Sequence, residues 1–312
     1  MNLRKRIDAL NRRPMPERDP LTADVEGIRR RLRRLRSESG QQGRDAILYR
    51  RDLPRSEPVR PRRRFENGRT VRLEEEVSGV ALPAPQRGQA FVIERSLDVS
   101  SQTWGPLCAA FAEQFRRGGS ALRRHVATAC GAAPVEPQDV IFMDLESTGL
   151  AGTPLFLIGT MTWEGAGLVV RQFFARDYSE EAAVISHFLR AARGKKLLVS
   201  FNGKAFDVPY IRVRAAATGL PFRLDADHLD LLHVCRRTWR DALPDCRLQT
   251  LESRVCGRVR HSDIPGSEIP EAYHQYVRTG NAVEMLEVLE HNRQDLLTLA
   301  ELMVRLPPPD AG

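Results

Sequence analysis

Two acidic residues, Asp144 and Glu146, end an apolar run that starts at Val140. The side chains of a β-strand alternate between its faces, so residues two apart project from the same side. Two adjacent carboxylates repel each other unless a cation lies between them, and hard oxygen ligands favour Mg²⁺ or Mn²⁺. The pair therefore predicts a divalent-metal site at a strand end, although a solvent-facing acidic strand end would have the same sequence.

A second candidate acid, Asp207, follows a short apolar run over 196–201 and falls where a helix over 208–218 is expected to begin. Asn202 lies where the chain leaves the run. An aspartate at a helix N-terminus is ordinarily a capping residue, and that explanation stands beside the metal-ligand one.

A third candidate pair, His291 and Asp295, lies within a predicted helix over 282–306. Residues four apart share one helical face, so the two side chains should lie together. Such a pair can simply stabilise a helix surface. Together with the other acids, it would complete four carboxylates and one group able to accept a proton near neutral pH. A leucine-rich run should anchor this helix on a sheet, through Leu296, Leu297, Leu299 and Leu302.

The elements that must position these residues follow the boundary that prolines mark at 134–137. Three strands come first, then a helix, a strand and further helices, which is the ribonuclease H-like arrangement of a mixed α/β sheet flanked by helices. The domain should span 139–312. Its expected elements are strands over 140–146, 155–163, 168–175 and 196–201, with a hairpin turn at 164–167, and helices over 179–192, 208–218 and 282–306.

The chain before this boundary is expected to form two further parts. Residues 65–138 should be a small β/α accessory segment, with strands at Thr70–Glu74 and Ala90–Glu94 and a helical connector over 105–130. Residues 1–64 carry 20 Lys and Arg against 9 Asp and Glu, whereas the remaining 248 residues carry 28 against 31. This basic arm, which is partly helical over 21–35, predicts contact with a polyanion such as nucleic acid; a solvated basic tail is the alternative.

Composition excludes several other classes of protein. No apolar stretch is long enough to cross a membrane, and the basic start has no apolar region after it, as a secretory signal would. The five cysteines include no Cys-x-x-Cys pair, so they predict reduced thiols in a cytoplasmic protein, with no disulfide framework and no zinc site.

The acidic residues fall into three motifs that resemble those of the DEDD superfamily of 3′–5′ exonucleases. They are Asp144-x-Glu146, Asn202-x-x-x-Phe206-Asp207 and His291-x-x-x-Asp295. The surrounding sequence resembles the YprB-like ribonuclease H-like proteins of bacteria, in the runs Phe142–Gly152, His228–His233, Asp263–Glu268 and His291–Asp295. One feature differs from the two usual subclasses, which place a Tyr four residues or a His five residues before the last Asp. This chain has His at the Tyr spacing, which leaves the identity of the general base open.

The resemblance implies a two-metal mechanism with Mg²⁺ or Mn²⁺. Asp144, Glu146 and Asp295 would hold one ion and Asp144 with Asp207 the second, while His291 would take a proton from water. Backbone N–H groups of Thr148 and Gly149 would meet the terminal nucleotide.

A substrate base should also be held near the acids. Asn202 belongs to the substrate-binding set, and Phe206 or Phe156 would stack on the base, although a position in the core is the preferred expectation for Phe206. Asp230, another acid near a strand end, should be structural. The expected substrate is a single-stranded 3′ end of DNA or RNA. A non-catalytic nucleic-acid-binding protein and a structure-specific endonuclease of the same fold remain the alternatives, and the sequence leaves the oligomeric state open.

Overall fold

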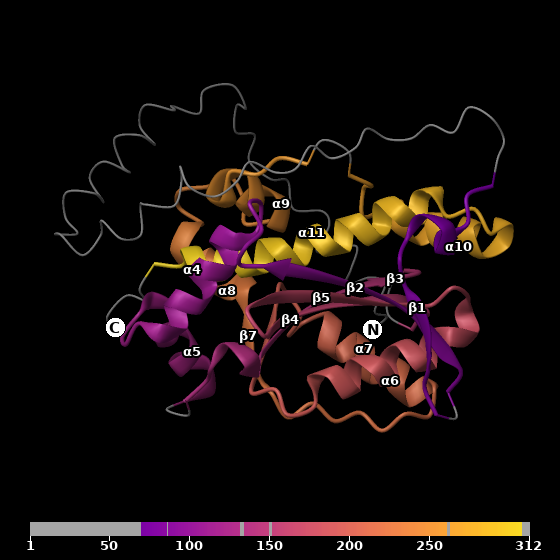
Figure 1. The fold of residues 1–312 in the computed structure, drawn as a ribbon, viewed down its shortest axis with the longest axis horizontal. Coiled ribbons are helices and arrows are strands. Elements are labelled where there is room, and N and C mark those ends of the chain that lie inside the picture. Colours follow the sequence, from indigo (N-terminus) through magenta and orange to yellow (C-terminus); the bar gives the residue numbers. More distant parts are fainter. Residues whose placement is uncertain (1–69, 86, 132–133, 150–151, 261–262, 308–312) are drawn as a thin grey trace, which may run out of the picture. The chain divides into compact units, whose positions relative to one another are not determined.

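A computed structural model of the chain describes residues 70–307, apart from positions 86, 132–133, 150–151 and 261–262 (Figure 1). The described residues belong to one compact unit. The basic arm over 1–64 and its predicted helix lie outside them. None of the helices within the described ranges is long and apolar enough to cross a membrane.

The core of the fold is a seven-stranded sheet with the strand order β1-β2-β5-β4-β3-β6-β7. The first five strands in this order pair antiparallel, and β6 and β7 join β3 in parallel, so the sheet is mixed as predicted. The strands are β1 (Val80–Pro83), β2 (Gln89–Asp98), β3 (Val140–Ser147), β4 (Leu155–Glu164), β5 (Gly167–Phe174), β6 (Leu197–Ser200) and β7 (Asp227–Asp230).

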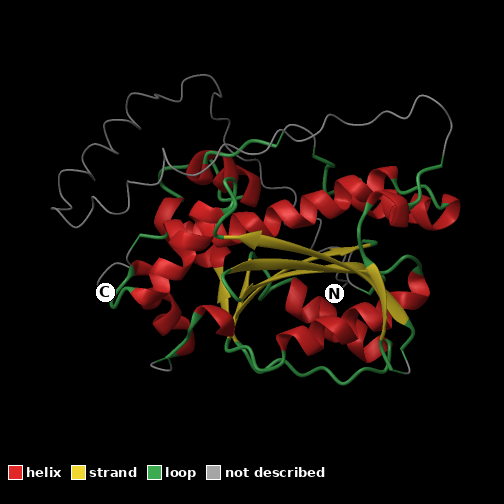
Figure 2. Cartoon of the chain, viewed as in Figure 1, coloured by secondary structure: helices red, strands yellow, loops and turns green. Residues whose placement is uncertain are grey.

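Helices cover both faces of this sheet (Figure 2). Helices α6 and α7 lie on one side, and α4, α10 and α11 lie on the other (Figure 1). The α-helices are α3 (Leu73–Glu76), α4 (Gly105–Arg116), α5 (Ala121–Cys130), α6 (Glu181–Ala192), α7 (Asp207–Ala217), α8 (Leu231–Trp239), α9 (Leu248–Leu251), α10 (Ile269–Thr279) and α11 (Val283–Arg305). Short turns of other helical types are η3 (Pro137–Asp139), η4 (Tyr178–Glu180) and the π-turn η5 (Glu252–Cys256).

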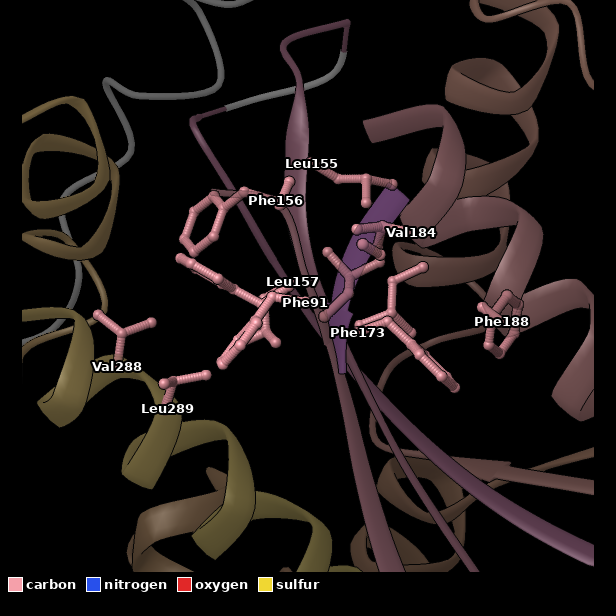
Figure 3. Packing of buried hydrophobic residues seen from close by; sticks show 14 of the residues in the cluster. Phe91, Leu155, Phe156, Leu157, Phe173, Val184, Phe188, Val288 and Leu289 are labelled. Atoms are coloured by element: carbon pink, nitrogen blue, oxygen red, sulfur yellow. The ribbon is translucent and has the colours of Figure 1, made fainter. Parts of the chain in front are cut away.

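Apolar side chains from both helical layers meet the sheet. In Figure 3, Val184 and Phe188 of α6 lie on one side of the strands, and Val288 and Leu289 of α11 lie on the other. The four leucines of α11 that were predicted to anchor it are buried in the core, together with Val140 and Phe142 of β3. Because residues two apart share a strand face, Asp144 continues this α11-facing row of β3.

Most of the predicted elements of 139–312 are present within one or two residues of their expected bounds. The predicted accessory segment differs. Strand β2, which contains Ala90–Glu94, pairs with β5 along its length from Phe91↔Phe174 to Asp98↔Gly167, so the described part of 65–138 extends the same sheet. Which distant strands pair with each other depends on the tertiary structure, and local sequence patterns do not reveal it.

The strand predicted at Thr70–Glu74 is wrong. Its alternating residues do bury Val71 and Leu73, but Val71 hydrogen-bonds to Asn281 and Ala282 ahead of α11 instead of a neighbouring strand. From Leu73 the chain turns into the short helix α3, whose three consecutive glutamates are good helix formers.

Candidate active site

Strand β3 presents Asp144 and Glu146 in the middle of the sheet. It lies between β4 and β6, and Asp144 is opposite Gly159 of β4. The register shifts after Glu146, so the two acids occupy the last regular positions of the strand. Central strands are shielded on both sides, and the two carboxylates are half-buried at the end of this one.

Asn292 of α11 holds Asp144 in place. Its fully buried amide donates from Nδ2 to Asp144 Oδ2 at 2.9 Å and to the Asp144 carbonyl oxygen at 3.2 Å. Its Oδ1 accepts from Gln172 Nε2 at 2.9 Å. This approach requires glycine at 159, because a Cβ there would lie 2.1 Å from Asn292 Oδ1.

We expect Gly159→Ala to destabilise the protein by about 1–3 kcal/mol, because the added methyl group must push α11 or β4 out of a packed position. Urea unfolding would measure the loss. Gly118→Ala is the matched control, since a Cβ at 118 meets nothing within 4 Å and should change stability little. Equal stability of the two variants would contradict the close approach.

Asp207 reaches the site from the neighbouring strand. Strand β6 runs parallel to β3, and after it the chain turns into α7, whose first residue is Asp207. The turn depends on Asn202, which has a left-handed φ of 65° and whose N–H donates to Asp230 Oδ1 at 2.8 Å. Asp207 is 7% exposed and lies close enough to raise the pKa of Asp144 electrostatically. The parallel pairing of β6 with β3 is the arrangement that the predicted approach of these two carboxylates requires, and their role as shared ligands stays a prediction.

His291 and Asp295 face the β3 acids from α11. His291 Nε2 lies 3.5 Å from Asp295 Oδ2 and 4.0 Å from Glu146 Oε1. Its other ring nitrogen, Nδ1, is 2.7 Å from Asp263 Oδ1. The helical spacing therefore brings the imidazole and the carboxylate together on the sheet side, as predicted.

The acids strongly perturb one another. Burial raises the pKa of Asp144 well above its usual range, and the charges of Asp295 and Glu146 raise it further. Burial and then the charges of Asp295 and Asp207 have the same effect on the pKa of Glu146. The pKa of Asp207 is raised to about 7, chiefly by burial and also by Asp230. Such a cluster favours either bound protons or a bound cation.

The donor chemistry fits a hard divalent cation, since carboxylate oxygens from β3, α7 and α11 converge here. Among the described residues, however, no three His, Cys, Asp or Glu side chains are already grouped around a single ion position. Asp295 pairs instead with Arg260, through a contact between Arg260 Nη2 and Asp295 Oδ1.

The raised pKa of Asp207 has a consequence for stability. Between the unfolded pKa near 4 and about 7, the folded protein without metal binds more protons than the unfolded chain, so its free energy of unfolding should fall as pH rises through this window. Asp207→Asn should flatten this decline. Urea midpoints measured in chelator from pH 4.5 to 7.5 would show it, and an unchanged pH dependence would contradict the buried carboxyl.

Two substrate contacts expected from the sequence are wrong. The Thr148 N–H already donates to the Pro154 carbonyl oxygen at 2.9 Å, so it is unavailable to a nucleotide. Phe156 is fully buried and stacks on Tyr273 with ring centroids 4.0 Å apart. In both cases a contact within the folded protein already occupies the group that was expected to meet the substrate. The role of Gly149 stays a prediction.

Phe206 lies outside the core, contrary to one of the two expectations for it, since it is 41% exposed beside Asp207. It remains a candidate for stacking on a base. Asp230 is structural, as predicted, because its carboxylate accepts from the backbone N–H groups of Asn202, Lys204 and Leu232.

Sequence reasoning gave no role to Arg260, Asp263 or Asn292. Asp263 and Asn292 lie inside runs that carry the family resemblance, but their contacts are long-range. Arg260 is one of many arginines and has no distinguishing spacing. Gly159 did carry a signal, since a glycine inside an apolar strand often marks a close approach.

The fold and these motifs define the class of protein. The family model of the RNase_H superfamily matches residues 141–307, more than half of the chain, and the chain belongs to this superfamily. The similarity to YprB-like proteins is confirmed by YprB of Bacillus subtilis, which is 32% identical over 173 residues that cover 54% of this chain and 42% of YprB.

Archaeal DNA polymerases are also similar. The DNA polymerase of Pyrococcus glycovorans is 26% identical over 193 residues, 53% of this chain and 24% of the polymerase. The family B DNA polymerase of Pyrobaculum calidifontis is a solved structure with 18% identity and a TM-score of 0.43, covering 52% of this chain and 24% of that one. The chain thus spans less than half the length of each of these relatives.

Proposed function

We propose that the protein is a divalent-metal-dependent nuclease that hydrolyses phosphodiester bonds of DNA or RNA, as a 3′–5′ exonuclease. The observation that carries the proposal is the meeting of Asp144, Glu146, Asp207 and Asp295 from three separate elements, with Asp207 buried and the other three half-buried. Three of these carboxyls have raised pKa values, which bound cations would lower. Similarity to DNA polymerases supports a nucleic acid as the partner.

Four acids would hold the metal ions. Asp144, Glu146 and Asp295 would bind one Mg²⁺ or Mn²⁺, and Asp144 with Asp207 would bind a second. Bound ions of this kind orient an attacking water and stabilise the leaving oxygen of an in-line displacement. The oxygen of water would bond to phosphorus as the bond from phosphorus to the 3′ oxygen breaks, and the 3′ oxygen would take a proton from solvent water as it leaves.

His291 would accept the proton of the attacking water. Its Nε2 is directed at Asp295 and Glu146, while Asp263 fixes the ring from the other side through Nδ1. Burial lowers the pKa of His291, but the hydrogen bond with Asp263 and the charge of Asp295 outweigh it, so the net pKa is raised. Bound cations would oppose that rise and favour the neutral imidazole that a base requires.

Digestion of labelled substrates tests the proposal. With Mg²⁺ or Mn²⁺, 3′-labelled single strands should release labelled mononucleotide at once, 5′-labelled strands should shorten stepwise, and circular strands should survive. Chelator should stop both reactions. Cleavage of circles would favour the endonuclease alternative. Binding without any cleavage would favour the non-catalytic alternative.

The basic arm over 1–64, which lies outside the described residues, should raise affinity without setting the chemistry. Each phosphate that a basic side chain neutralises releases counterions, so binding should weaken with salt with a logarithmic slope of about 0.9 per contact on duplex. Deleting the arm should flatten this slope and raise KM while sparing kcat. An unchanged salt dependence would show that the arm packs on the protein or binds another partner.

A further inference from the structure

Arg260 places a positive charge among the acids of the site. Its Nε donates to Glu252 Oε2 at 2.8 Å, its Nη1 lies 3.2 Å from Asp263 Oδ2, and its Nη2 contacts Asp295 Oδ1. The side chain is only 9% exposed. One guanidinium thus joins three carboxylates, of which Asp295 alone belongs to the proposed ligand set.

The surroundings of Arg260 are built to hold it. Glu252, which is 2% exposed, lies outside the ligand set and pairs with both Arg260 and Arg258. Arg258 in turn donates to Thr298 and Glu301 of α11, so the chain segment that carries Arg260 is fixed to α11 without help from Asp295. In the metal-free protein, these ion pairs hold the buried guanidinium in one position, whereas a surface arginine is free to move.

The contact with Asp295 conflicts with metal binding. A guanidinium on Oδ1 neutralises the carboxylate and occupies a coordination direction that an ion would need. Arg260 therefore supplies, at one edge of the cluster, the charge compensation that a divalent ion would supply at its centre.

We infer that Arg260 is an internal counter-ion for Asp295 and that a divalent ion must displace its guanidinium to gain Asp295 as a ligand. The inference rests on the proposed function, because it takes Asp295 as a metal ligand. The apparent metal affinity is then the intrinsic affinity multiplied by the fraction of molecules in which Asp295 is free of Arg260. Glu252 and Asp263 keep the displaced guanidinium paired, so its release leaves no isolated buried charge.

Arg260→Gln tests the inference through metal binding alone, without nucleic acid. The full chain would be titrated with Mn²⁺, and the electron paramagnetic resonance of free Mn²⁺ would measure binding. The variant should bind Mn²⁺ roughly 10–100-fold more tightly than the wild type. This factor corresponds to the loss of one charged hydrogen bond, that between Arg260 and Asp295 in the metal-free protein. Arg293→Gln is the matched control. It removes an arginine of similar exposure from α11 that pairs with Glu290 and not with Asp295, and it should leave the affinity near that of the wild type.

The possible outcomes separate the inference from the proposed function. If the wild type binds Mn²⁺ and Asp144→Asn weakens that binding, but Arg260→Gln binds no tighter, the metal site stands and the inference fails. An equal gain in Arg293→Gln would reveal a general charge effect and would also overturn it. Absence of Mn²⁺ binding in the wild type and in Arg260→Gln would remove both proposals.

Loss of Arg260 could unfold the metal-free protein, and stability then provides the readout. Mn²⁺ should restore the folded state of Arg260→Gln, as seen by circular dichroism, where NaCl at the same ionic strength does not. A variant that stays unfolded at Mn²⁺ concentrations that saturate the wild type would count against the inference, because the ion would not be replacing the arginine.

Discussion

Asp144→Asn should remove nuclease activity while leaving the fold intact, with a loss of roughly 10³-fold or more in kcat, since each ion contributes several kcal/mol of transition-state stabilisation and Asp144 is the ligand proposed to be shared by both. The amide oxygen of asparagine can still accept the hydrogen bond from Asn292. Without metal, the variant should be at least as stable as the wild type, because a buried carboxylate that repels Glu146 has been neutralised.

Asp230→Asn provides the contrasting control, since Asp230 accepts from three backbone N–H groups near the same strand ends. An amide there has one acceptor oxygen in place of two. In contrast to Asp144→Asn, this variant should therefore lose stability, as urea unfolding would show. Wild-type rates of cleavage of single-stranded DNA and RNA by Asp144→Asn would exclude the proposed ligand set.

Local periodicity could predict much of the site from the sequence. The alternation of a strand places Asp144 and Glu146 together, and the pitch of a helix does the same for His291 and Asp295. Parallel pairing of β6 with β3 follows from the order of the elements once the fold class is recognised. These four residues depend on short-range geometry that every strand and helix shares.

The rest of the site depends on contacts between distant segments. Arg260 and Asp263 lie in an irregular segment before α10, where no repeating pattern shows which way a side chain points. Thr148 fails as a substrate contact because a carbonyl six residues later takes its N–H. The addition of β2 to β5 is likewise invisible locally, because its alternating sequence would suit any sheet with a free edge.

Arg260 also explains how the acids can be stable before any ion binds. Like charges this close favour bound protons, and burial together with the neighbouring carboxylates raises the pKa values of Asp144 and Glu146. The guanidinium compensates the charge of Asp295, and it lowers the pKa of Glu146 against the larger effects that raise it. Protons and an arginine thus share the neutralisation that two cations would complete.

His291→Ala should lower kcat by about 10²–10⁴-fold, the usual effect of losing a general base, while leaving Mn²⁺ affinity little changed because His291 is not in the proposed ligand set. His291→Tyr should recover part of the rate, since a tyrosine occupies this spacing in the related exonuclease subclass. Single-turnover cleavage of a 3′-labelled strand at saturating Mn²⁺ would measure both variants.

His274→Ala is the matched control for removal of an imidazole, because His274 of α10 bonds to Tyr178 away from the acids and should leave the rate unchanged. In the wild type, activity should fall on the acid side as His291 protonates. Metal-bound water and the carboxylates titrate as well, so the variants decide the assignment where the pH profile cannot. Near-wild-type turnover by His291→Ala would reduce His291 to a partner of Asp263, and the proton of the attacking water would then leave directly to solvent.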